Sequence, residues 1–154
     1  MSAVTYSDGR VKEYLNRHFV PVRLHCDFEQ PSAEMRRYGI KWTPTLLVLD
    51  EDGQEQHRSE GYLTPKELMA QLSLGMAKLN LAHEAFEPAT RELAQVLESC
   101  PECATAPEAR YFLGVSRYRQ THDLRELRRT WEVLARDFPQ SEWTRKAEPY
   151  SQID

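Results

Sequence analysis

The clearest structural signal in this chain is the segment Trp42-Thr43-Pro44-Thr45-Leu46-Leu47-Val48-Leu49-Asp50. The mainly apolar residues 45–49 are typical of a strand that is buried on both faces. Asp52-Gly53 then favours a hairpin turn, because glycine adopts the positive φ that such turns require. We expect the polar residues 54–60 to return as an edge strand. The segment therefore predicts a β-hairpin that is entered through a proline.

Before the hairpin, the sequence predicts a helix, a strand and a second, shorter helix. The first helix covers residues 8–16, whose first residue can cap it. In residues 19–27 apolar side chains alternate with others, which is the period of a pleated strand and places Cys26 on its buried face. Residues 32–38 have the pattern of a short helix, which Gly39 ends in the left-handed conformation.

The rest of the chain has helical patterns only. Thr64-Pro65-Lys66-Glu67 is a capping box with proline at the first helical position, and it begins a long helix. Beyond it we expect a helical hairpin, a loop at residues 100–105 and a second hairpin. A further capping box, Thr105-Ala106-Pro107-Glu108, is expected to start the helix after this loop.

The first half of the chain resembles the thioredoxin superfamily, specifically its bacterial thioredoxin-like domains. The matching residues are Thr5 to Asp8, Tyr14 to Asn16, Phe19 to Val22, Asp27, Tyr38 to Ile40, Trp42 to Asp50, Gly53, Gly61 and Tyr62. The proline that matches Pro44 is cis in that superfamily, and the residue before it offers its backbone to an extended peptide. The resemblance thus makes Trp42, Thr43 and Pro44 the candidate substrate-binding residues. A packing role is the alternative for Trp42.

The same resemblance includes a departure from the superfamily pattern. There, a central strand and a Cys-x-x-Cys precede the residues that match Thr5-Tyr6, and this sequence starts after that point. Either the chain is truly shortened, or Met1 was assigned inside a longer reading frame. The missing strand would separate residues 19–27 from 45–49, so its absence leaves two open edges. We expect those strands either to pair directly or to accept a second chain, which makes a homodimer a candidate assembly.

The second half contains an internal repeat and resembles tetratricopeptide repeats. Residues 93–101 superpose on residues 131–139, and fixed-period helical pairs are the units of solenoids. One copy of the repeat matches through Leu113-Gly114, Tyr118, Leu127, Trp131, Leu134 and Pro139, and a weaker copy through Leu74-Gly75, Ala89, Leu93, Val96 and Pro101. The resemblance implies protein binding along a concave helical face.

Cys100-Pro101-Glu102-Cys103 is the one Cys-x-x-Cys of the sequence, so Cys100 and Cys103 are the candidate catalytic residues of an oxidoreductase. They do not follow a strand into a helix, which is the thioredoxin-type context. The repeat offers a structural alternative, because Cys100 aligns with the packing position Phe138 and Cys103 with the capping position Ser141. Half of a metal site is a third alternative, but zinc requires two further ligands, and we expect no metal.

Composition and charge exclude several other functions. A net charge of -4 gives no electrostatic basis for nucleic-acid binding. The basic cluster of Arg125, Arg128 and Arg129 is expected to be a solvated helix face. Residues 1–8 do not have the pattern of a signal peptide, and no apolar run reaches the ~20 residues of a membrane span. We therefore expect a cytoplasmic protein without membrane contact and, since it has no phosphate-binding loop, without a cofactor.

The sequence predicts an α/β fold in two parts: a truncated thioredoxin-like domain at 1–75 and an all-α tetratricopeptide-like domain at 76–154. Its lineage is thiol redox or protein quality control. The leading hypothesis is a non-catalytic module that binds a protein or peptide, because no thiol is expected opposite Pro44. The alternatives are a thiol–disulfide oxidoreductase, using Cys100 and Cys103 or a motif upstream of Met1, and a structural subunit that assembles through its open sheet edge.

Overall fold

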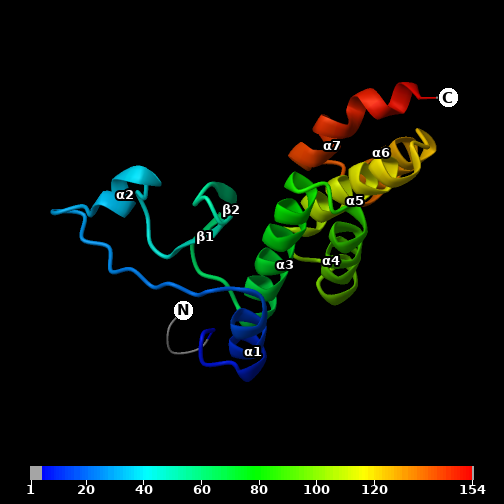
Figure 1. Cartoon of the computed structure of the whole chain (residues 1–154). Coiled ribbons are helices and arrows are strands. Elements are labelled where there is room, and N and C mark those ends of the chain that lie inside the picture. Colours follow the sequence, from blue (N-terminus) through cyan, green and yellow to red (C-terminus); the bar gives the residue numbers. More distant parts are fainter. Residues whose placement is uncertain (1–4, 154) are drawn as a thin grey trace. The chain divides into compact units, whose positions relative to one another are not determined.

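The computed structural model describes residues 5–153, and Figure 1 shows their helices and strands. Met1, on which the expectation about the start of the chain depends, lies outside these residues. The chain divides into two compact units between Met69 and Ala70, and each unit is described by itself. This boundary lies inside helix α3 (Pro65–Ala82), so α3 contributes to both units.

The first unit contains the helices and strands predicted around the hairpin, except for one strand. Asp8 caps the first helix by accepting a hydrogen bond from the Arg10 backbone N–H at 2.8 Å. Ser32 caps the second by accepting one from Met35 at 3.2 Å, and Gly39 follows it with a φ of 59°. The elements are α1 (Gly9–His18), α2 (Ala33–Arg37), β1 (Thr45–Leu49) and β2 (Glu55–Glu60).

The two strands form the predicted hairpin. They pair antiparallel, with Thr45 opposite Glu60 and a register shift after Val48. Asp50 stabilises the turn, because its Oδ1 accepts hydrogen bonds from the backbone N–H groups of Asp52 and Gln54 at 3.0 and 2.8 Å. The expected burial of this strand on both faces is wrong: only Val48 is buried in β1. A sheet of two strands has too little structure around it to cover both faces.

Residues 19–27 do not form the predicted strand. Val20, Val22 and Leu24 are 91%, 78% and 55% exposed, and Cys26 is half-buried with a free thiol. A strand needs a neighbour for its backbone N–H and C=O groups, and the sheet of the described residues contains β1 and β2 only. Direct pairing of this segment with β1, one of the two expected arrangements, is therefore not formed.

The second unit is helical, as predicted, and runs from the later part of α3 to α7 (Figure 1). Its core packs residues of α3, α4 and α5 together with both cysteines of the 100–105 loop, and Leu74, Leu93 and Val96 are almost fully buried. No helix within residues 5–153 has both the length and the apolar character needed to span a membrane. The remaining elements are α4 (Phe86–Ser99), α5 (Ala106–Thr121), α6 (Arg125–Asp137), α7 (Glu142–Ala147) and the 3-10 helix η1 (Glu148–Gln152).

The two predicted capping boxes have different outcomes. At the start of α3, the Thr64 N–H donates to Glu67 Oε2 at 2.9 Å and the Glu67 N–H donates to Thr64 Oγ1 at 3.3 Å. At the start of α5 the predicted box is wrong. Thr105 has helical φ and ψ values of -75° and -19°, and its buried hydroxyl has no partner among the described residues. A capping side chain reaches the first free N–H groups from extended backbone, which Thr105 does not adopt.

An aromatic cluster packs α7 and η1 onto α5. The Trp143 ring lies 5.2 Å from that of Tyr111 and 5.3 Å from that of Phe112, centroid to centroid. The Tyr111 and Tyr150 hydroxyls are 3.0 Å apart. Burial, together with this hydrogen bond, raises the pKa of Tyr150. Trp143 and Tyr111 therefore have packing roles.

Candidate functional site

The loop that enters β1 carries the predicted substrate-binding residues Trp42, Thr43 and Pro44. The Thr43–Pro44 peptide bond is cis. The Trp42 carbonyl accepts a hydrogen bond from Thr45 Oγ1 at 2.7 Å, and the Pro44 carbonyl accepts one from the Gly61 N–H at 2.8 Å. The carbonyl groups on both sides of Thr43 are therefore engaged, and the loop is attached to both strands of the hairpin.

Thr43 differs from its two neighbours. It is exposed, and its backbone N–H and C=O make no hydrogen bond with any of residues 5–153. Main-chain recognition of an extended peptide requires one such donor and acceptor, held in place and open to solvent. The hydrogen bonds of Trp42 and Pro44 hold the Thr43 backbone in place, so the loop has the geometry of a short docking edge.

Two exposed aromatic side chains flank this edge. Trp42 is 63% exposed, so it is not a core residue, and Tyr62 is 58% exposed. Rings with an apolar body and a polar tip suit a surface that contacts another protein. Tyr62 was not among the predicted site residues. The hairpin register could have indicated its position. Thr45 pairs with Glu60, so Gly61 lies beside Pro44, and Tyr62 is the next residue.

The predicted catalytic cysteines lie in the second unit, so they belong to a different unit from Thr43 and Pro44. Cys100 and Cys103 form a disulfide with their Cα atoms 5.3 Å apart, and it links the end of α4 to the turn before α5. The two residues are 1% and 8% exposed and belong to the apolar core. Cys100 thus occupies the packing position that the repeat predicts, whereas Cys103 is also a core residue and not a cap.

Burial determines what this disulfide can do chemically. Thiol–disulfide exchange requires an incoming thiolate to reach one of the two sulfur atoms. Here the core side chains that surround the pair, including Leu93 and Val96, restrict that approach. Nor do the described residues contain a group of three His, Cys, Asp or Glu side chains arranged to hold a metal ion.

Residues 1–75 match the family model described as a thioredoxin-like domain. No curated protein and no solved structure matches the chain. The chain therefore carries a thioredoxin-like domain with a small two-stranded sheet, followed by a helical region. The family match does not reach residues 76–154, for which the tetratricopeptide-like character stays a prediction.

Proposed function

We propose that this protein binds an extended peptide or protein segment at the loop before β1 and does not catalyse thiol exchange there. The observation that supports this function best is the backbone of the exposed residue Thr43, whose N–H and C=O make no hydrogen bond within residues 5–153. A peptide running alongside Thr43 pairs with both groups, as a strand pairs with a sheet edge. Trp42 and Tyr62 then contact its side chains.

The cysteine content of the first unit also favours binding over catalysis. Cys26 is the single cysteine before the unit boundary at Met69. A dithiol–disulfide cycle needs two thiols that can approach each other. A lone half-buried thiol cannot complete that cycle, so residues 5–69 by themselves favour holding a peptide at the Thr43 edge over oxidising or reducing one.

The test is a binding measurement on the full chain with fluorescently labelled extended peptides of varied apolar content. Trp42→Ala should weaken binding about tenfold or more, as expected for an aromatic anchor. On saturation, the Thr43 amide resonance should shift. Leu124→Ala is the matched control, because Leu124 is an exposed apolar residue of the other unit, and it should leave binding unchanged. Equal affinities of wild type and Trp42→Ala would exclude this site.

A thiol–disulfide oxidoreductase is the second candidate function, and it is favoured by the disulfide between Cys100 and Cys103. Its test is reduction of a protein disulfide by the full chain, compared with the Cys100→Ser and Cys103→Ser variants. Activity that both variants lose supports this candidate. Weak activity that persists unchanged in both variants removes it. The cytoplasmic location stays a prediction. Stable disulfides are rare in the cytosol, so a Cys100–Cys103 pair that stays oxidised in the cell would argue against that location.

For the open side of the sheet, the partner that we propose is a second copy of this chain. β1 has a strand neighbour on one side only among the described residues. Val20, Val22 and Leu24 add exposed apolar side chains in the same unit. Unpaired strand edges and exposed apolar side chains both favour association, so this unit supports a homodimer as well as peptide binding.

A further inference from the structure

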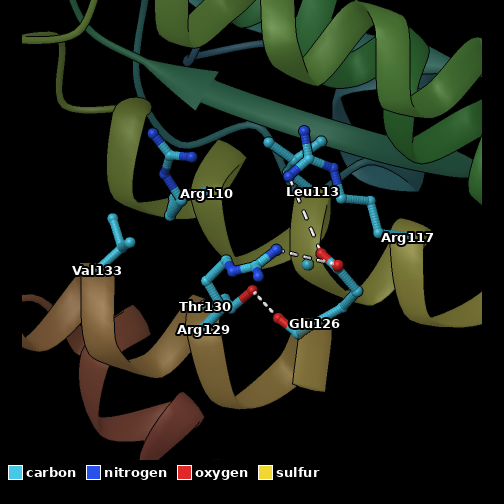
Figure 2. Close-up of a pocket in the computed structure, with 8 residues that line it drawn as sticks. Arg110, Leu113, Arg117, Glu126, Arg129, Thr130 and Val133 are labelled. Atoms are coloured by element: carbon cyan, nitrogen blue, oxygen red, sulfur yellow. Dashed lines mark hydrogen bonds and ion pairs between the residues drawn. The ribbon is translucent and has the colours of Figure 1, made fainter. Parts of the chain in front are cut away.

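A small cleft between α5 and α6 lies entirely within the second unit (Figure 2). It is independent of the Thr43 edge, which belongs to the first unit. Its lining includes Leu113, Gly114 and Val133 and three arginine side chains: Arg110 and Arg117 from α5, and Arg129 from α6.

Most charges around this cleft are already paired. The Glu126 carboxylate lies 3.3 Å from Arg129 Nη1 and 4.0 Å from Arg117 Nη1. Beside the cleft, Asp137 is held by Arg136, with an Nε–Oδ1 distance of 2.7 Å. Figure 2 shows the dashed lines that converge on Glu126, and it shows none at Arg110.

Arg110 is the exception. Its guanidinium makes no hydrogen bond or ion pair with any of residues 5–153, and its Nε is buried without a partner. Burial, followed by repulsion from Arg117, lowers the pKa of Arg110, and Asp137 opposes the shift. An arginine stays charged even so. A guanidinium without an acceptor, close to other arginine side chains, is a favourable place for an anion.

We propose that the cleft binds a small doubly charged oxyanion of the phosphate type, with the guanidinium groups of Arg110, Arg117 and Arg129 as its donors. The planar fork of an arginine side chain matches a phosphate oxygen pair. The residues that line the cleft include three guanidinium groups and one carboxylate, that of Glu126, which leaves a formal excess of two positive charges. That excess fits a dianion better than a single carboxylate. The dianion is either free phosphate or a phosphate monoester group carried by a ligand.

Part of this proposed anion site can be recognised in the sequence. Arg110 and Arg117 are seven residues apart, which is about two helical turns, so they share one face of α5. Arg129 was expected on a solvated face, and it is indeed 67% exposed. What the sequence does not reveal is that α6 places Arg129 and Glu126 against that face of α5 and leaves Arg110 unpaired.

The experiment is an NMR titration of the full chain at constant ionic strength with sodium phosphate, O-phosphoserine or sodium acetate. Phosphate should produce saturable shifts at the Arg110 Nε–H and at amides of α5 and α6. Arg110→Gln should weaken phosphate binding about tenfold or more, the size of effect expected for a lost charge-assisted hydrogen bond. Arg91→Gln is the control, because Arg91 is an exposed, ion-paired arginine of α4, and it should bind like wild type.

Arg117→Gln is the second variant and keeps the test decisive if Arg110→Gln does not fold. Wild-type phosphate affinity in the folded Arg110 or Arg117 variant overturns the proposal. So does a shift that never saturates, or acetate binding as tightly as phosphate. Tighter binding of O-phosphoserine than of phosphate supports the site and assigns it a ligand-borne phosphate group. The reverse order supports it with free phosphate as the ligand.

Discussion

Gly114 on α5 lies so close to Thr130 on α6 that a β-carbon at position 114 would be 2.7 Å from the Thr130 β-carbon. Thr130 cannot easily move away. It is 5% exposed, it is β-branched and therefore stiff about its first side-chain torsion, and its hydroxyl donates to the Glu126 carbonyl at 2.7 Å. The contact between these two helices therefore depends on a residue without a side chain.

The first prediction is that Gly114→Ala destabilises the protein. Alanine improves helix propensity by about 1 kcal/mol, but overpacking a tight contact costs about 1–3 kcal/mol. We expect the overpacking cost to exceed the propensity gain, with a net loss of up to about 2 kcal/mol in the free energy of unfolding, measured by urea denaturation. Gly9→Ala is the control, since a β-carbon there would meet nothing within 4 Å, and its stability should be unchanged or slightly raised. Equal behaviour of the two variants would refute the close contact.

The second prediction concerns the capping box of α3. Thr64→Ala should cost about 1 kcal/mol of stability, because it removes the acceptor for the Glu67 N–H and the hydroxyl that donates to Glu67. The measurement is urea denaturation at neutral pH. Thr121→Ala is a suitable comparison, because Thr121 lies at the exposed end of α5 and only its neighbours' backbone groups contact its hydroxyl. A larger loss in Thr121→Ala than in Thr64→Ala would contradict the role of the box.

The third prediction follows from the charge state of Glu67. Hydrogen bonds from the Thr64 backbone N–H and hydroxyl lower the pKa of Glu67 below its ordinary value of 4.5. The folded protein therefore binds this proton less readily than the unfolded chain does, so the contribution of Glu67 to stability is present above pH 4.5. It is lost as the pH falls through the lower folded pKa.

Glu67→Gln tests this prediction, because glutamine also fits a capping box and does not titrate. The stability advantage of wild type over Glu67→Gln should shrink when denaturation is repeated below pH 4.5. An advantage that stays constant or grows on acidification would show that the Glu67 carboxylate is not stabilised in the folded state.

The sequence was sufficient to predict those structural features that depend only on residues close by in the chain. Asp8, Ser32 and the Thr64–Glu67 box each satisfy the first free N–H groups of the helix that they begin. Asp52-Gly53 lies in the turn of the hairpin. Such signals lie within a few residues of the structure that they determine, so they can be recognised without knowledge of the fold.

The predictions that failed depend on distant partners. The alternation in residues 19–27 is that of a strand, but a strand also needs a paired neighbour, and the sheet of the described residues has none for it. Thr105 has the right sequence context for a cap, but its backbone is already helical and its hydroxyl is buried without a partner among the described residues. The unpaired Arg110 likewise results from how α6 packs against α5, which no local pattern encodes.

The fourth prediction tests the exposed segment and the proposed homodimer together. The double variant Val20→Asp, Val22→Asp should change the free energy of unfolding of the monomer by less than about 0.5 kcal/mol, because both side chains are largely exposed. Size-exclusion chromatography with light scattering should show a dimer for wild type and a monomer for the variant. Val11→Asp is the contrasting variant: Val11 is fully buried, so a carboxylate there should cost about 3 kcal/mol or more. A wild-type monomer, or a dimer that both aspartates leave intact, would refute the homodimer.

The fifth prediction separates the three cysteines by their accessibility. Cys26 is half-buried and free, whereas Cys100 and Cys103 are bonded to each other inside the core of the second unit. In native protein treated with a thiol-free reductant and N-ethylmaleimide, Cys26 should be modified first. Cys100 and Cys103 should react about a hundredfold more slowly, because the core must open locally before either reagent can reach the sulfur atoms. Peptide mass spectrometry measures all three rates, and denaturant should abolish the difference between them.

The Cys26→Ser variant allows the slow reaction of Cys100 and Cys103 to be measured alone. Modification of Cys100 and Cys103 as fast as Cys26 in the folded protein would show that the disulfide is open to exchange, and it would shift the balance of functions toward the oxidoreductase.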